Sequence, residues 1–244
     1  MSEHFLSVEQ ATRRFAGLVA VDSVSFALDR GEILSLIGPN GAGKTTLFNL
    51  ITGQLKPSDG AIMFRNERID ALPPHARAQR GMGRTFQIAK PLTGLTTREN
   101  VMVGAFMRHR TYTAAYDHAS AVLAEVGLEP RAEVPAAELT LSERRRLEVA
   151  RALAMQPELI LLDEVMAGLN ATEVTQVIDL IHRLNARGVT FLVIEHNLKV
   201  VRAFSRRVIV LDHGAKIAEG SAADVLSDPE VIRAYLGKKH VGHA

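Results

Sequence analysis

A run of eight residues, Gly38 to Thr45, fits the pattern G-x-x-x-x-G-K-[ST], which is typical of loops that bind the phosphates of nucleoside triphosphates. Gly41 and Gly43 let the backbone approach an anion closely, because they lack the Cβ that restricts φ. Lys44 can reach β- and γ-phosphates, and the Thr45 hydroxyl is a ligand for Mg²⁺. A glycine turn that binds nothing is the alternative, which the spacing disfavours. The residues predicted to surround the phosphates are Gly38, Pro39, Asn40, Gly41, Ala42, Gly43, Lys44, Thr45 and Thr46.

A second candidate is the acidic pair Asp163 and Glu164, which directly follows the apolar run Leu159–Leu162. A buried strand of this kind delivers carboxylates to the edge at which open α/β sheets bind ligands. Asp163 is then placed to hold Mg²⁺, directly or through a water, and Glu164 to polarise an attacking water. Two solvated acids at a strand end are the alternative, and the presence of a phosphate loop argues against it.

The elements on either side of the loop have the order that phosphate binding needs. Glu32–Ile37 is predicted to be a strand that enters the loop, and Thr46–Ile51 the beginning of the helix that leaves it. The N-terminus of that helix aims backbone N–H groups and the positive end of its dipole at phosphate oxygens. Additional strands are predicted at Phe5–Val8, Val24–Leu28, Ala61–Phe64, Val189–Ile194 and Arg207–Asp212.

The stretch from Thr96 to about Met155 has a helical pattern instead. Thr97 is expected to N-cap a helix that runs through Phe106, and Ala114–Val126 is expected to form a helix that stops at Gly127. Farther along, Glu173–Arg187 predicts a helix closed by Gly188, and Ser221 with Asp224 suits the first turn of another helix. We therefore expect an α/β fold with an inserted helical region.

The composition narrows the function classes. The 244 residues include 29 Lys and Arg against 27 Asp and Glu, so the charge balance gives no sequence-wide reason to expect nucleic-acid binding. Cysteine is absent, which excludes disulfides and thiolate chemistry. No secretory signal is evident, and no apolar run approaches the roughly 20 residues of a membrane span. The expected compartment is the cytoplasm, with any membrane role carried by a partner.

Several further motifs resemble those of the nucleotide-binding subunits of ABC transporters. They follow one another in the order of that family and surround the two sites described above. The matching stretches are Phe15, Arg84–Gln87 at the Q-loop, Leu139–Arg151 at the signature, Ala167–Asn170 at the D-loop and Ile194–Asn197 at the switch histidine.

This resemblance implies ATP and Mg²⁺ as cofactors and further roles for individual residues. By the resemblance, Phe15 stacks on adenine, Gln87 senses Mg²⁺ and the γ-phosphate, and His196 contacts the γ-phosphate. Two subunits pack head to tail in the family, so Thr140 and Ser142 act in trans on the partner's nucleotide. The implied catalytic residues are Glu164, His196 and Gln87, and the implied magnesium ligands are Thr45, Gln87 and Asp163.

The resemblance also implies a fold. It is a P-loop NTPase of the ABC ATPase type, with a central mostly parallel sheet, an N-terminal antiparallel β-subdomain and an inserted α-helical subdomain. The expected boundaries are a single ATPase domain over residues 5–237, in which 5–90 and 157–237 form the core and β-subdomain, about 91–156 form the helical subdomain with the signature, and 238–244 form a tail.

Within the family, the chain is most similar to the ATPase subunits of branched-chain (hydrophobic) amino-acid importers. The stretches that carry this likeness are Arg14–Val21, Gly83–Gln87, Arg145–Arg151 and Pro229–Gly237. The expected function is ATP hydrolysis that drives membrane import, although importers of urea and short amides share this subunit type. Expected partners are a second ATP-binding subunit, membrane permease subunits and, indirectly, a substrate-binding protein, at the cytoplasmic face of the inner membrane.

Some positions depart from the family pattern. The signature L-S-G-G-Q is replaced by Leu139–Glu143, in which Thr140 retains a hydroxyl and Leu141 replaces a glycine. Ser142 is expected to N-cap the following helix and so to keep a helix N-terminus aimed at phosphate. Val165 replaces the usual proline after Glu164, and Asn170 replaces the usual D-loop aspartate.

Three alternative interpretations remain. One is a soluble ABC ATPase without membrane partners, and another is a weakly hydrolysing subunit paired with a better one. The run Arg144–Arg146 also suggests nucleic-acid binding, but three consecutive helical residues point in different directions, which favours solvated or interface arginines.

Overall fold

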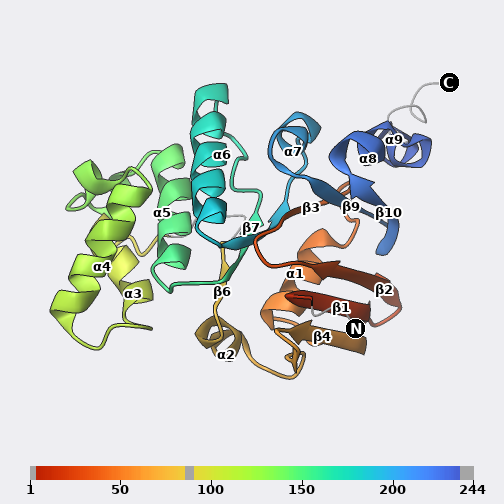
Figure 1. Cartoon of the computed structure of the whole chain (residues 1–244), viewed down its shortest axis with the longest axis horizontal. Helices are drawn as coiled ribbons and strands as arrows, with labels where there is room; N and C mark the ends of the chain where they lie inside the picture. The colour runs from red at the N-terminus through yellow and green to blue at the C-terminus, as the bar shows by residue number, and fades with distance from the viewer. Residues whose placement is uncertain (1–3, 86–90, 237–244) are drawn as a thin grey trace. The chain divides into compact units, whose positions relative to one another are not determined.

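The computed structural model describes residues 4–85 and 91–236, and these fall into two compact units. Unit 1 comprises residues 1–77 and 190–244, and unit 2 comprises residues 78–189. The expected subdomain boundaries group the chain differently and stay a prediction. Figure 1 labels helices and strands of both units where there is room.

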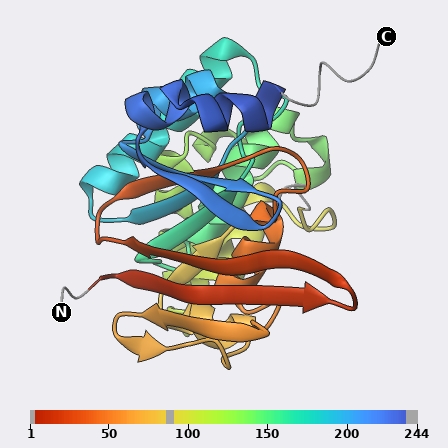
Figure 2. The same cartoon turned by 90° about the vertical axis from the view of Figure 1, so that its right-hand side faces the viewer.

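Unit 1 contains an antiparallel sheet with the strand order β2-β1-β4-β5. The two longest strands form a hairpin that Figure 2 shows at the front of the molecule. One face is buried through Leu6, Val8 and Ala11 of β1 and Val24 of β2, and its alternation with exposed positions is the period that a half-buried sheet requires. The strands are β1 (Leu6–Phe15), β2 (Leu18–Leu28), β4 (Asp59–Phe64) and β5 (Glu67–Arg68).

Unit 1 also contains strands in the order β10-β9-β3-β8, in which β3 pairs parallel with both β8 and β9. All five residues of β3 and of β8 are buried, as expected for central parallel strands. The strands are β3 (Ile33–Ile37), β8 (Thr190–Ile194), β9 (Arg207–Asp212) and β10 (Ala215–Ser221). The helices of this unit are α1 (Lys44–Thr52), α7 (Leu198–Phe204), α8 (Ala222–Ser227) and α9 (Pro229–Leu236), while the division between the units falls within α2 (Pro74–Gln79).

A buried arginine closes the C-terminal end of α1. The Arg77 side chain is 1% exposed, and its Nη1 atom donates to the carbonyls of Leu50 and Ile51, each at 2.6 Å. Its Nε and Nη2 atoms donate to the carbonyls of Leu72 and Asp70 at 3.0 and 3.1 Å. Burial lowers the pKa of this guanidinium to about 10, so it remains charged at neutral pH. A cation at this end complements the negative end of the helix dipole.

Unit 2 combines two parallel strands with the helical region of the chain. Strand β6 pairs with β7 in the register Met82 to Leu159. Helices α3, α4 and α5 lie side by side (Figure 1). The elements are β6 (Met82–Arg84), α3 (Thr97–Ala105), α4 (Tyr112–Glu125), the 3₁₀ turns Glu129–Arg131 and Ala136–Glu138, α5 (Leu141–Leu153), β7 (Leu159–Asp163) and α6 (Ala171–Ala186).

Most expected elements are confirmed within two or three residues, but β1 extends to Phe15 and β2 already begins at Leu18. Two helix caps are wrong, and the first of them is at α3. Helix α3 is capped by Thr96, not by Thr97: the Thr96 hydroxyl accepts the Glu99 N–H, and the Glu99 carboxylate accepts the Thr96 N–H. Thr97 is instead buried, and its hydroxyl donates to the Val134 carbonyl. The reciprocal pair satisfies two backbone donors where a lone hydroxyl would satisfy one. Among the described residues, no helix is long and apolar enough to cross a membrane.

Candidate functional site

The loop between β3 and α1 is held in place by close packing beneath its glycines. Gly38 has φ 150° and Gly43 has φ 96°, which side chains rarely adopt. A Cβ on Gly38 would lie 2.2 Å from the Leu211 carbonyl oxygen, and a Cβ on Gly43 would lie 2.4 Å from the Ala20 carbonyl oxygen. The glycines therefore let the loop settle onto the end of β9 and onto β2.

Lys44 lies within the curve of this loop. Its Nζ atom donates to the Gly38 carbonyl at 2.8 Å and to the Pro39 carbonyl at 3.0 Å, and the side chain is buried. The ammonium group is thus held among backbone groups instead of extending into solvent. The next residue, Thr45, is exposed.

The N-terminus of α1 suits an anion. Its N-cap is Gly43, which provides no side-chain hydrogen bond, and its first turn contains no acidic residue. Helix N–H groups at this end have no acceptor within the helix itself, so an external acceptor is favourable. Together with Lys44, this end of α1 fits phosphate oxygens.

The acidic pair lies at the end of β7 in unit 2. The Asp163 side chain is 2% exposed, and its Oδ2 atom lies 3.4 Å from Nη2 of Arg84. The Asp163 N–H donates to the hydroxyl of Thr85 at 3.2 Å. Carboxylate and hydroxyl oxygens are ligands that Mg²⁺ prefers, so Asp163 and Thr45 fit that ion by their chemistry.

Glu164 occupies an unusual backbone conformation. Its φ is 50°, in the left-handed region that non-glycine residues seldom adopt, and its carbonyl accepts the Ala167 N–H at 3.1 Å. Residues held in such conformations cluster at functional sites. Val165, which takes the place of the usual proline, is fully buried and so contributes to the core beneath this turn.

The predicted cap of the signature helix is wrong. Thr140, not Ser142, caps α5: its hydroxyl accepts the Glu143 N–H at 3.3 Å, and the Glu143 carboxylate accepts the Thr140 N–H at 2.8 Å. Ser142 lies in the first turn and is buried. Glu143 also pairs with Arg131, whose Nε lies 3.1 Å away. The capping box therefore satisfies two backbone donors at the start of α5 within the chain itself.

Leu141 and Gly168 are complementary in shape. A Cβ on Gly168 would lie 2.9 Å from a methyl carbon of Leu141, and Gly168 has φ 80°. The bulky side chain in the signature thus packs over a glycine of the predicted D-loop, while Leu141 itself stays 47% exposed.

Other candidate residues are more exposed. His196 is exposed in the loop after β8, where its neighbour Asn197 caps α7 by accepting the N–H groups of Lys199 and Val200. Phe15 ends β1 and is 38% exposed, with the Arg13 guanidinium 4.6 Å from its ring centroid. Gln87 lies outside the described residues.

The structure brings the candidate residues together in two groups. Unit 1 contains the phosphate loop, Phe15 and His196, and unit 2 contains Asp163, Glu164, Thr140 and Ser142. The placement of one group against the other stays a prediction. Sequence reasoning assigned no role to Arg84, because nothing in its neighbourhood along the chain indicates a partner 79 positions away.

Comparisons with known proteins identify the family that this chain resembles along its length. A family model described as "ABC transporter" matches residues 21–167, and one described as "Branched-chain amino acid ATP-binding cassette transporter" matches residues 215–241. The chain is 39% identical to the high-affinity branched-chain amino acid transport ATP-binding protein LivG of Escherichia coli K12, over 98% of this chain and 100% of that protein.

Two solved structures extend the likeness to the fold. The ADP conformation of MJ1267, an ATP-binding cassette of an ABC transporter, is 32% identical with a TM-score of 0.88, covering 97% of this chain and 100% of that one. A dimeric post-hydrolysis state of the cassette MJ0796, bound to ADP and Pi, is 26% identical with a TM-score of 0.81 and covers 89% of this chain and 98% of that one.

Proposed function

The chain belongs to the ABC transporter family as an ATP-hydrolysing, nucleotide-binding subunit, and we propose that it drives import of branched-chain amino acids or related small amides. The observation that carries this proposal is the likeness to LivG over the whole length of both proteins. The branched-chain family model at residues 215–241 supports it independently, since this stretch lies beyond the general ABC match.

In the proposed mechanism, the phosphate loop binds and orients ATP. The N-terminus of α1 and Lys44 provide positive potential for the β- and γ-phosphates, and residues 38–46 surround them. Thr45, Gln87 and Asp163 would hold Mg²⁺, which supplies charge neutralisation between the phosphates when it is bound. Phe15 stacks on the adenine ring.

The remaining proposed roles concern the attacking water and the partner subunit. Glu164 orients the water and accepts its proton, while Gln87 and His196 contact the γ-phosphate. Thr140 and Ser142 act on the nucleotide of a second ATP-binding subunit. The MJ0796 dimer supports such an assembly for this chain.

We further propose that this subunit works at the cytoplasmic face of the inner membrane. Its partners there are integral permease subunits and, through them, a substrate-binding protein. The name of LivG as a transport ATP-binding protein supports this placement.

Uptake measurements in cells test the import proposal. A strain that lacks this chain should lose ATP-dependent uptake of labelled leucine, isoleucine or valine and regain it with the wild-type chain but not with Glu164→Gln. Glu173→Gln is a matched control, because Glu173 is the capping partner of Asn170 at the start of α6 and glutamine can keep that capping box. Unchanged branched-chain uptake together with lost uptake of urea or amides would replace the substrate class. Unchanged uptake of all of these would overturn the import proposal.

One observation favours a second candidate function, a weakly hydrolysing subunit of a heteromeric pair. The N-terminus of α5 contains Glu143, whose negative charge is unfavourable for a γ-phosphate facing that end of the helix. ATPase rates of the isolated chain and of the chain with its co-purifying subunits distinguish the candidates. Equal rates per subunit would contradict the pairing, and hydrolysis that never responds to a membrane partner would favour a soluble ABC ATPase.

A further inference from the structure

The carboxyl end of β7 contains a buried ion pair, and the proposed mechanism gives its arginine no role. Asp163 is 2% exposed and Arg84, at the end of β6, is 10% exposed, with 3.4 Å between Nη2 and Oδ2. A buried charge is costly unless it is compensated, and each of these side chains compensates part of the other's charge.

Backbone pairing fixes the arrangement. Arg84 is the register partner of Leu161, and the Thr85 N–H donates to the Leu161 carbonyl at 2.9 Å. The Thr85 hydroxyl in turn accepts the Asp163 N–H at 3.2 Å. Two adjacent residues therefore hold Asp163: Arg84, the last residue of β6, lies against its carboxylate, and the hydroxyl of Thr85 accepts its backbone N–H.

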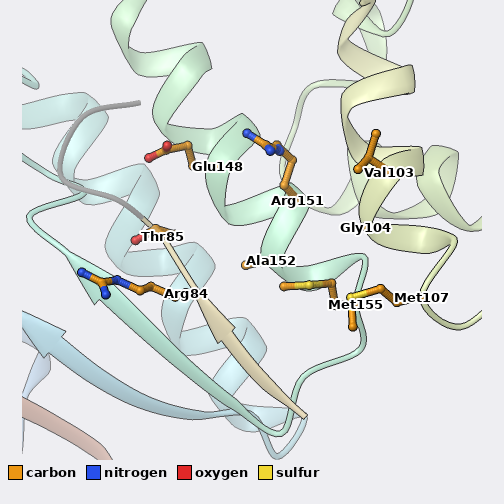
Figure 3. A pocket seen from close by; sticks show the side chains of 9 residues that line it. All are labelled: Arg84, Thr85, Val103, Gly104, Met107, Glu148, Arg151, Ala152 and Met155. Carbon is orange, nitrogen blue, oxygen red and sulfur yellow. The ribbon is translucent and has the colours of Figure 1, made fainter. Parts of the chain in front are cut away.

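Arg84 and Thr85 line a cavity together with Glu148, Arg151 and several residues of α3 and α5. Figure 3 shows the Arg84 side chain directed away from Met107 and Met155. Burial lowers the pKa of Arg84, and the charge of Asp163 opposes that effect, so the guanidinium keeps its charge at neutral pH.

We propose that Arg84 is a positioning residue that shares the Asp163 carboxylate with Mg²⁺. Without Mg²⁺, the guanidinium masks the negative charge of Asp163 from the triphosphate and keeps the carboxylate oriented. With Mg²⁺, Arg84 competes for the same oxygen and so sets the Mg²⁺ concentration that nucleotide binding requires. This inference rests on the proposed role of Asp163 as a magnesium ligand.

The proposal predicts opposite effects of removing Arg84 on nucleotide binding with and without Mg²⁺. Arg84→Met should weaken binding of a fluorescent ATP analogue in EDTA, because the unmasked carboxylate repels the triphosphate. The same variant should lower the half-saturating Mg²⁺ concentration, because the competing cation is gone. Each change is expected to be about three- to tenfold, the scale of one charge pair a few ångströms apart at a dielectric close to that of water. A merely structural role would weaken binding in both conditions.

The matched controls are Arg151→Met, which removes an arginine from the same cavity, and Arg84→Lys, which keeps the charge. Arg151→Met should retain the wild-type Mg²⁺ dependence. Arg84→Lys should shift that dependence less than Arg84→Met does, because lysine keeps the charge but lacks the planar fork. In the Asp163→Asn background, Arg84→Met should change neither constant. If Arg84→Met alone fails to fold, recovery of the fold in the double variant supports the pairing, and failure of both overturns it.

The outcomes also separate this inference from the proposed function. A wild-type Mg²⁺ dependence in Asp163→Asn would refute the role of Asp163 itself. An altered dependence in Asp163→Asn combined with unchanged constants in Arg84→Met would overturn only the role of Arg84.

Discussion

Two helices of this chain begin at residues with a proposed role at the nucleotide, α1 behind Gly43 and α5 behind Thr140. Helix α1 has no capping side chain and no acid in its first turn. Helix α5 has a complete capping box with Glu143, and Glu143 is paired with Arg131. The first helix leaves its N-terminus for an external acceptor, whereas the second has two of its N-terminal backbone N–H groups, those of Thr140 and Glu143, bonded within the chain.

This difference between the starts of α1 and α5 predicts different effects on nucleotide binding and on the stability of the fold. Residues at the start of α1 are expected to contribute mainly to phosphate affinity, because their backbone donors serve a ligand. Residues at the start of α5 are expected to contribute mainly to stability, because the capping box already satisfies two of the backbone donors there. Substitutions at the two ends should therefore change different measured quantities.

Lys44→Ala should have the largest effect, and it should fall on binding. Loss of a hydrogen-bonding cation is expected to weaken ATP binding about 10- to 100-fold, at about 1.5–3 kcal/mol per bond to a charged group. Titration with a fluorescent ATP analogue measures the change. Lys56→Ala, at an exposed lysine in the same unit, is the control and should bind normally. Wild-type affinity in Lys44→Ala would remove the proposed distinction between the two helices.

Gly43→Ala tests whether packing shapes the start of α1. Its left-handed φ alone is expected to cost about 1–3 kcal/mol of stability, and the contact with the Ala20 carbonyl adds to this. Gly41→Ala is the comparison, because Gly41 has φ 83° but open space where a Cβ would lie. Urea unfolding should show a lower free energy of unfolding for Gly43→Ala than for Gly41→Ala. Equal values would mean that the loop relaxes away from Ala20 without cost.

Thr140→Ala should destabilise the protein without affecting ATP binding by the isolated subunit. Loss of an N-cap hydroxyl is expected to cost about 1 kcal/mol, or about 2–4 °C in Tm for a chain of this size. Thermal unfolding followed by circular dichroism measures the shift. Thr140→Ser preserves the hydroxyl and should lie close to wild type. A decrease in ATP affinity of the isolated subunit would contradict the internal role of this cap.

Glu143→Gln should have the smallest effect on stability, and it should raise ATP turnover. Glutamine preserves the capping box but removes the charge, and the lost pair with Arg131 is expected to cost less than about 1 kcal/mol. Turnover of the assembled dimer should rise about two- to fivefold, from the roughly 0.3–1 kcal/mol that a charge contributes at a helix end. A steady-state ATPase assay measures this rise. Unchanged turnover would indicate that the start of α5 faces no phosphate.

The sequence predicts the phosphate loop and its flanking strand and helix well, because their chemistry is local. The start of α5 is harder to predict, since Thr140 and Ser142 both carry a hydroxyl that can cap a helix. The decisive signal is the glutamate three residues after Thr140, which completes a reciprocal pair; the same signal, Glu99 after Thr96, identifies the cap of α3. The position of each cap is therefore predicted by the threonine and the glutamate three residues after it together, and not by the hydroxyl alone.

Long-range partners lie beyond sequence reasoning. Arg84 meets Asp163 across 79 positions, and Arg77 meets the end of α1 across 26 and 27. No periodicity or motif connects such pairs, because strand register and helix packing bring them together. The contact of the Leu141 side chain with Gly168 is equally unpredictable from the sequence, although each of the two residues belongs to a motif that the sequence reveals.

The four backbone carbonyls that accept hydrogen bonds from the Arg77 guanidinium have a spectroscopic consequence. Its guanidinium protons are bonded to Leu50, Ile51, Leu72 and Asp70 and shielded from water, so they should exchange slowly and give a resolved nitrogen-correlated NMR signal. Exposed arginines exchange too quickly to contribute there. The chain therefore contains a natural probe at the far end of α1, with which nucleotide binding at one end of the helix can be followed from the other.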